Sequence, residues 1–149
     1  MSCVLRVRGA DFAVDEFLAG SVLKPIAIFR RGEPRLPGSQ PGGPKLNASG
    51  FHVVASEAGF FSLQIQITDA VHFLELNQGE LDRVVAFPGV EKVSLDFGIE
   101  ERNVAAQSEH FPPNLLSILG SLGIWLEFTL YPCEEPDASA GRPPNELLR

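Results

Sequence analysis

The chain is poor in cysteine, the residue on which disulfide frameworks and most zinc and redox motifs depend. It has only Cys3 and Cys133, which lie near opposite ends of the sequence. The Cys-x-x-Cys spacing is missing, which excludes the common structural zinc and redox motifs. We expect both thiols to be free rather than joined in a disulfide.

Long hydrophobic runs are also missing. The apolar stretches extend over a few residues only, whereas a membrane-spanning helix needs about 20 in succession. The N-terminal segment lacks the basic region followed by an apolar region that marks a secretion signal, and its alternation predicts a strand instead. We therefore expect no membrane partner and a cytoplasmic location.

Motifs for catalysis and cofactor binding are absent as well. The histidines His52, His72 and His110 are too far apart in sequence to form a metal-ligand pair on one helix. The chain has no Gly-x-Ser-x-Gly nucleophile motif and no glycine-rich nucleotide-binding motif. Cys3 opens a strand that resembles an edge strand, not a helix N-terminus that would activate its thiol. The sequence predicts no catalytic residue, no metal site and no cofactor.

What is present is typical of one globular domain. The 149 residues are 44% hydrophobic and 21% charged, which suits a soluble protein and is too apolar for intrinsic disorder. The net charge of −7 is uneven: residues 1–50 carry seven basic and four acidic side chains, and residues 51–149 carry five and fifteen. Such a chain is repelled by nucleic acid and suits a basic protein partner. The alternative is that the charge only maintains solubility.

Hydrophobic periodicity predicts most of the elements. Strands are expected at 3–9, 24–31, 50–56, 93–99 and 124–131, and helices after Asp11, at 80–87 and at 113–122 with Gly123 as C-cap. Residues 62–77 fit both periods, because the apolar residues alternate at first and then step by three and four. The length of the segment favours a helix.

The predicted fold is α+β, with helices packed on one face of a mostly antiparallel sheet of four or five strands, a variant of the ferredoxin-like arrangement. Residues 1–132 form the single domain, which contains a Pro- and Gly-rich loop at 32–50. A loop of this length is either functional or mobile. Residues 133–149 are Pro-rich and aperiodic, and they predict a flexible C-terminal tail.

Three arginines, Arg30, Arg31 and Arg35, lead into this loop. Guanidinium groups bind carboxylates and phosphates through paired hydrogen bonds, so these residues form a candidate anion site. The alternative, which we prefer, is that they are rim charges of a mobile loop that pair with the acidic half of the same molecule, because no second anchoring element accompanies them.

The last predicted strand supplies a candidate interface. Trp125 and Tyr131 project from the face opposite the apolar residues of that strand, and exposed aromatic side chains often anchor interfaces. Asp96, Glu100 and Glu101 are included as acidic members of the interface. They could also serve acid–base catalysis, but a solvated strand face and a charged turn explain them better.

Two blocks of the chain resemble a known family. The first has a strand ending at Gly9, a helix with an acidic cap and a strand leading to Arg31-Gly32-Glu33. The second is PPNLLSILGSLGIWLEFTLY. Together they resemble the bacterial domain-of-unknown-function family catalogued as four-two-seven-nine, over most of residues 3–131, although Phe51 stands where that family usually has tryptophan. The resemblance implies a small α+β cytoplasmic protein and provides no catalytic residues.

We therefore predict a non-enzymatic protein-binding module of the bacterial cytoplasm, an immunity-like protein whose acidic surface neutralises a basic partner. Two alternatives stay open. One is a homodimeric structural or regulatory module that uses the face of Trp125 and Tyr131. The other is a binder of small anionic ligands, or an enzyme, that uses the loop arginines.

Overall fold

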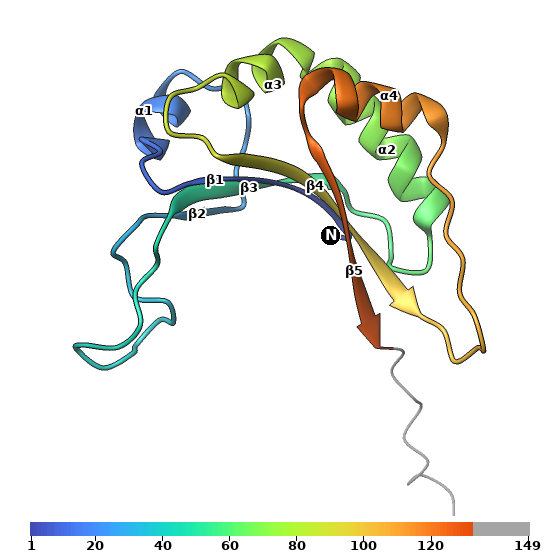
Figure 1. Ribbon diagram of the computed structural model, residues 1–149, viewed down its shortest axis with the longest axis horizontal. Helices are drawn as coiled ribbons and strands as arrows, with labels where there is room; N and C mark the ends of the chain where they lie inside the picture. The colour runs from blue at the N-terminus through green and yellow to red at the C-terminus, as the bar shows by residue number, and fades with distance from the viewer. Residues whose placement is uncertain (133–149) are drawn as a thin grey trace, which may run out of the picture.

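Within residues 1–132, which the computed structural model describes, five strands form one sheet and four helices cover one side of it (Figure 1). The predicted α+β class, with helices on one face of a mostly antiparallel sheet, is confirmed. The ferredoxin-like detail stays a prediction. Cys133 and the predicted tail at 133–149 lie outside the described residues.

The strands lie across the sheet in the order β2-β3-β1-β4-β5. They are β1 (Cys3–Gly9), β2 (Ala27–Phe29), β3 (Ser49–Ser56), β4 (Lys92–Glu101) and β5 (Trp125–Pro132). Neighbours are antiparallel except β4 and β5, which run parallel because a helix carries the chain back between them. The expectation that the first strand resembles an edge strand is wrong. It lies at the centre, because its pairing partners come from distant parts of the chain.

The helices are α1 (Val14–Ala19), α2 (Leu63–Leu76), α3 (Gln78–Val85) and α4 (Pro113–Leu122). The ambiguous segment is the helix α2, because the helical period turns Leu63, Ile67 and Leu74 toward the core together. Helix α4 ends at Gly123, whose φ of 71° confirms the predicted left-handed C-cap. Helix α1 begins at Val14, later than the cap expected at Asp11. None of these helices is long and apolar enough to cross a bilayer.

The core lies between the helices and the covered face of the sheet. Alternate residues of β1 (Cys3, Leu5 and Val7) are fully buried there, together with Phe51 of β3. Phe51 stacks on Phe17 of α1 at 5.7 Å between ring centroids. Burying one such side chain contributes about 1.5–3 kcal/mol, so apolar packing on this one face holds the helices to the sheet.

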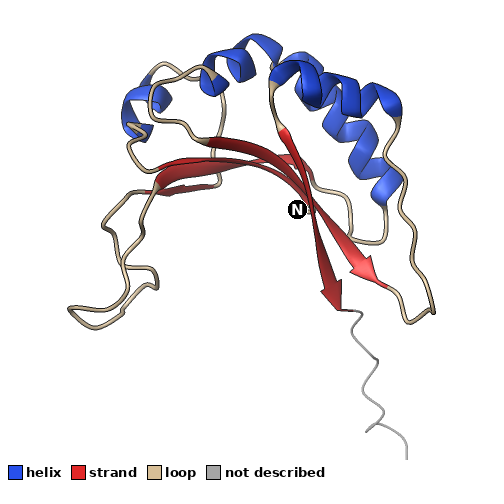
Figure 2. Cartoon of the chain, viewed as in Figure 1, coloured by secondary structure: helices blue, strands red, loops and turns tan. Residues whose placement is uncertain are grey.

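Within residues 1–132, no helix lies over the other face of the sheet (Figure 2). The long loop between β2 and β3 projects from this open side (Figure 1). It folds back on itself as an irregular hairpin, in which the Gly32 N–H donates to Leu46 at 2.8 Å and the Arg35 N–H donates to Pro44 at 3.0 Å. The loop therefore forms a wall beside the open face.

Candidate functional site

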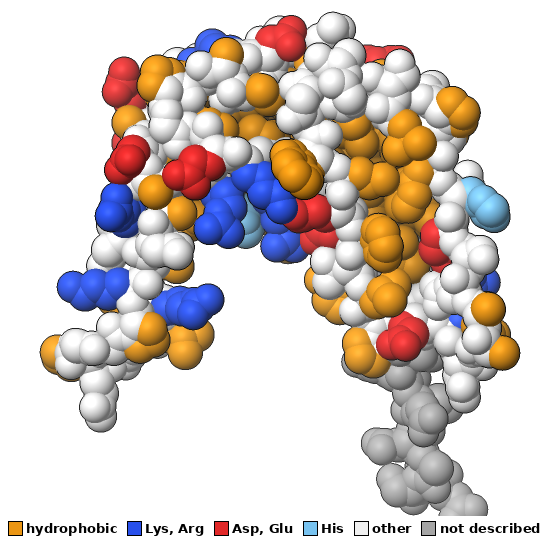
Figure 3. Space-filling model, in the orientation of Figure 1, with side chains coloured by type: hydrophobic (Ala, Val, Ile, Leu, Met, Phe, Trp, Pro, Cys, Tyr) orange, Lys and Arg blue, Asp and Glu red, His pale blue; other side chains and the backbone are white. Residues whose placement is uncertain are grey.

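A hollow of about 360 Å³ lies where the loop wall meets the open face of the sheet. Figure 3 shows basic side chains gathered in this hollow, between the loop and β5. Its charged lining consists of five cationic side chains and one carboxylate: Arg6, Arg8, Arg35, Lys45, Lys92 and Glu127. The hollow is thus a cationic surface on a chain whose net charge is −7.

Strand alternation brings the sheet-borne cations together. Arg6 and Arg8 alternate along β1 with the buried Leu5 and Val7, so both face the open side. Arg8 lies opposite Lys92 in the register of β1 with β4. The central position of β1 therefore places basic residues of two strands side by side.

Arg6 is held by a buried carboxylate. Its Nη2 donates to Asp96 Oδ2 at 2.5 Å, and Thr129 Oγ1 donates to Asp96 Oδ1 at 2.9 Å. Asp96 is only 4% exposed, so this pair is partly shielded from water and fixes the guanidinium in place. The Arg6 Nε–H is buried and has no hydrogen-bond partner within residues 1–132.

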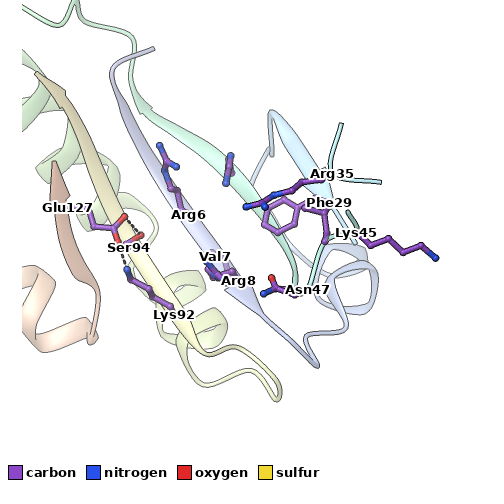
Figure 4. A pocket seen from close by; sticks show the side chains of 13 residues that line it. Arg6, Val7, Arg8, Phe29, Arg35, Lys45, Asn47, Lys92, Ser94 and Glu127 are labelled. Atoms are coloured by element: carbon purple, nitrogen blue, oxygen red, sulfur yellow. Dashed lines mark hydrogen bonds and ion pairs between the residues drawn. The ribbon is translucent and has the colours of Figure 1, made fainter. Parts of the chain in front are cut away.

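The carboxylate in the lining is already neutralised. Glu127 of β5 accepts hydrogen bonds from Lys92 Nζ and, at 3.0 Å, from Ser94 Oγ (Figure 4). The hydrogen bond from Lys92 holds the pKa of Glu127 below its ordinary value. Lys92 Nζ also lies 5.3 Å from the centre of the Trp125 ring. This group forms the rim of the hollow on the β5 side.

Three of the cations have no such compensation. Arg8, Arg35 and Lys45 make no ion pair and no side-chain hydrogen bond with the part of the chain that the structure describes. Figure 4 shows Arg35 reaching over Phe29 toward the space between the loop and β1, whereas the ammonium of Lys45 points away from it. Arg8 and Arg35 therefore offer unpaired guanidinium groups to an incoming anion, and Arg6 lies beside them with its Nη2 bonded to Asp96.

His52 is a titratable side chain in the lining of the hollow. It lies opposite Arg6 in the register of β1 with β3 and is half-buried. Burial, and next the positive charge of Arg6, lower its pKa below the ordinary value of 6.5, while Asp96 opposes them. The imidazole is therefore mainly neutral at pH 7, and a bound anion would favour its protonated form.

The structure separates the three predicted loop arginines. Arg30 makes a two-pronged ion pair with Asp15, at 2.8 Å from Nε and 2.6 Å from Nη2. That hydrogen-bonded pair lowers the pKa of Asp15. Arg31 pairs with Asp11 at 3.0 Å. The expectation of partners in the acidic half of the chain is wrong for these two arginines, because both partners belong to the first 50 residues. Of the three, Arg35 is the one that lines the hollow.

The predicted interface residues also differ in how far they are exposed to solvent. Trp125 is 63% exposed and Tyr131 39% exposed on the open side of β5, where Tyr131 stacks on Phe60 at 4.4 Å. Asp96 is not on a solvated face as expected. It is buried, because Arg6 and Thr129 cover it. Glu100 is half-buried and Glu101 is exposed at the end of β4.

Sequence reasoning did not identify most of the hollow. Arg6, Arg8, Lys45 and Lys92 were not singled out, although the alternation already put Arg6 and Arg8 on the polar side of a strand. His52 was considered only as a metal ligand. The missing information was the sheet order, because these residues become neighbours only when β3 and β4 flank β1.

No group of metal-ligating side chains occurs in the part of the chain described by the structure. Cys3 is buried there, and loss of hydration raises the pKa of its thiol far above the ordinary value. Comparisons of the chain with protein-family models, curated proteins and solved structures find no match. The resemblance to a family of unknown function therefore stays a prediction, and the site has to be interpreted from its own chemistry.

Proposed function

We propose that the protein is a binding module that holds a small anionic ligand, carrying phosphate or carboxylate groups, in the hollow on the open face of its sheet. The observation that carries this proposal is the excess of cations there: five basic side chains line the hollow with one carboxylate. That carboxylate, Glu127, is already bonded to Lys92 and Ser94.

The size of the hollow supports a small ligand. About 360 Å³ lies within the usual range of small-molecule sites, about 300–1,000 Å³. Three guanidinium groups on two different elements, β1 and the loop, can approach one ligand from different directions. Such an arrangement fixes the orientation of an oxyanion better than a single cation does.

The charge of the rest of the molecule favours a compact anion over a long one. A cationic cleft concentrates small anions locally, even on an acidic protein. A nucleic acid would extend past the hollow and be repelled by the rest of a chain whose total net charge is −7. This contrast is consistent with the prediction that nucleic acid is not the partner.

The lining favours binding over reaction. Its polar groups are predominantly guanidinium, ammonium, amide and hydroxyl donors, which hold an anion in place. No carboxylate of the part of the chain that the structure describes is bonded to His52 and could orient it as a general base. The proposal therefore retains the predicted non-enzymatic role and assigns it an anionic ligand.

The test is a calorimetric titration of the full chain with two probes, pyrophosphate and citrate, which separate phosphate from carboxylate recognition. Arg35→Ser removes a guanidinium from the hollow. Arg31→Ser removes one from the same loop outside it and serves as the matched control. We expect Arg35→Ser to weaken binding roughly tenfold, as for the loss of one charge-assisted hydrogen bond, and Arg31→Ser to leave it unchanged.

Binding of one probe and not the other identifies the headgroup chemistry. If neither probe binds at low salt, or if both variants weaken binding equally, the hollow is not the site. Stronger binding of a single-stranded oligonucleotide than of both probes would also overturn the proposal.

The other partner predictions rest on different observations. A basic protein partner, as for an immunity-like protein, is supported by the net charge alone and stays a prediction, as does the cytoplasmic location.

A further inference from the structure

The outer edge of β5 is open and apolar. In the sheet order β5 is the last strand, and nothing within residues 1–132 pairs with its outer side. Four of its eight residues are large, apolar and exposed: Trp125 (63%), Phe128 (59%), Leu130 (50%) and Tyr131 (39%). Natural edge strands are usually kept short or carry charges that prevent pairing. The one charged residue of β5 is Glu127, and its carboxylate is paired with Lys92.

The opposite edge of the sheet shows the usual protection. There β2 has three residues, and the loop that follows it turns away into its own hairpin. The long, apolar strand β5 lacks both devices, so its composition requires a different explanation.

The sequence of β5 is self-complementary about Phe128. In an antiparallel pair of two β5 strands with a two-fold axis through Phe128, residues equally far from Phe128 lie opposite each other. Trp125 then faces Tyr131 of a second copy, and Leu126 faces Leu130 of that copy. Glu127 faces Thr129. Every apolar side chain on β5 meets an apolar one, and cross-strand aromatic pairs of this kind stabilise a sheet.

Neighbouring registers lack this match. An axis through Glu127 sets two Glu127 carboxylates directly opposite each other, which destabilises the pair. An axis through Thr129 sets Glu127 against Tyr131 and Leu126 against Pro132, whose missing N–H cannot take part in the ladder. The axis must also pass through a residue, because directly opposite residues of an antiparallel pair point to the same side of the sheet.

We propose that β5 is the interface for a second copy of this chain, paired antiparallel about Phe128 to give one continuous sheet of ten strands. Helix α4 adds to this surface: Leu116 is 46% exposed, and Figure 3 shows hydrophobic side chains gathered over α4 and β5. A two-fold axis perpendicular to the sheet brings the α4 helices of the two copies to the same side of it. The isologous contact closes on itself, so it stops at a dimer.

This interface meets the anion site only at Glu127, which forms the rim of the hollow on the β5 side, and at Trp125, which lies beside Lys92. The guanidinium groups of the hollow belong to β1 and the loop, which take no part in the pairing of β5. Loss of ligand binding would leave the dimer intact, and the two proposals therefore fail in different experiments.

The first test is sedimentation of the full chain across the micromolar range. Phe128→Arg puts two positive charges opposite each other on the axis. Ile65→Arg on α2 is the matched control, because Ile65 is 56% exposed, close to the 59% of Phe128. We expect a dimer for the original chain and for Ile65→Arg, and dimerisation at least roughly tenfold weaker for Phe128→Arg. A monomer throughout the range for the original chain, or a dimer unaffected by Phe128→Arg, overturns the proposal.

The second test fixes the register by oxidative cross-linking in a Cys133→Ser background. Residues directly opposite in an antiparallel pair have Cα atoms about 4.5–5.5 Å apart, which suits a disulfide. We expect Phe128→Cys to cross-link to itself. Glu127→Cys and Thr129→Cys should cross-link when mixed, and neither alone. Cross-linking of either one alone, at the rate seen for Phe128→Cys, would show a different register and overturn the proposal.

Discussion

The two faces of the sheet are formed by the same strands but make different interactions: apolar packing on the covered face and contacts between charged groups on the open face. On the covered face, Leu5 and Val7 of β1 are fully buried under the helices. On the open face, Arg6 and Arg8 of the same strand meet other charged groups beside the hollow. One strand thus contributes to the core and to the candidate site at alternate positions.

This difference separates folding from binding. Apolar packing is non-directional and close to water-free, so it supplies most of the stability. The charged groups of the open face are partly hydrated and contribute little individually. Substitutions on the covered face should therefore lower stability, whereas most substitutions on the open face should alter binding with little change in stability.

The largest expected effect is on the covered face. Phe51→Ala removes a fully buried ring that stacks on Phe17, and we expect the free energy of unfolding to fall by about 3–5 kcal/mol. Chemical denaturation monitored by circular dichroism measures the loss. Phe29→Ala is the control, because Phe29 lies on the neighbouring strand and lines the hollow on the open face. An equal loss for Phe29→Ala would contradict the proposed difference between the faces.

The exception on the open face is the buried carboxylate Asp96. Asp96→Ala leaves the Arg6 guanidinium without its partner, and we expect a loss of about 1–3 kcal/mol. The loss is below that for a fully buried pair because the Arg6 side chain is 41% exposed. Thr129→Val, which removes only the hydroxyl donor to Asp96, should cost less when measured in the same denaturation experiment. A larger loss for Thr129→Val would show that the hydroxyl, and not the ion pair, holds Asp96.

The covered face was largely predictable from the sequence. Alternation in residues 3–9 and 93–99 and helical spacing in 113–122 identified elements whose apolar sides became the core, because burial selects the period directly. The segment at 62–77 satisfies both periods, and its length alone favoured the helix that the structure confirms as α2.

The hollow was not predictable in the same way. Arg35 was identified from its loop, but Arg6, Arg8 and Lys92 gain meaning only from the order of β1, β3 and β4. Sheet order depends on long-range pairing, and no local period encodes it. The exposure of Trp125 was predictable from alternation within β5, whereas the burial of Asp96 required knowing that Arg6 lies beside it.

A smaller effect is expected from His52 as the pH changes. Because its pKa in the folded chain lies below its ordinary value of 6.5, the unfolded chain binds more protons between the two values, and stability falls as the pH falls through that interval. Above pH 7 this contribution is constant. We expect His52→Gln to reduce the slope of unfolding free energy against pH between about pH 7 and 5.5.

The pKa of Glu127, which is lowered chiefly by its hydrogen bond from Lys92, affects stability in a different interval. Its contribution is present above the ordinary value of 4.5 and is lost as the pH falls further. Glu127→Gln is therefore the control for His52→Gln. A change in slope near pH 6 for Glu127→Gln, and none for His52→Gln, would show that the imidazole is not the group that titrates there.

The smallest effect on stability is expected for Arg8→Ala. The Arg8 side chain is exposed and makes no ion pair within residues 1–132, so its removal should change the free energy of unfolding by less than about 0.5 kcal/mol. Because Arg8 lies next to Lys92, any change should be toward higher stability, through relief of repulsion between the two cations. The same variant should lose affinity for pyrophosphate or citrate in the calorimetric titration. A residue that lowers stability by its presence and strengthens binding is the clearest sign that the open face serves a ligand. Unchanged affinity would mean that Arg8 contributes only to the general surface charge.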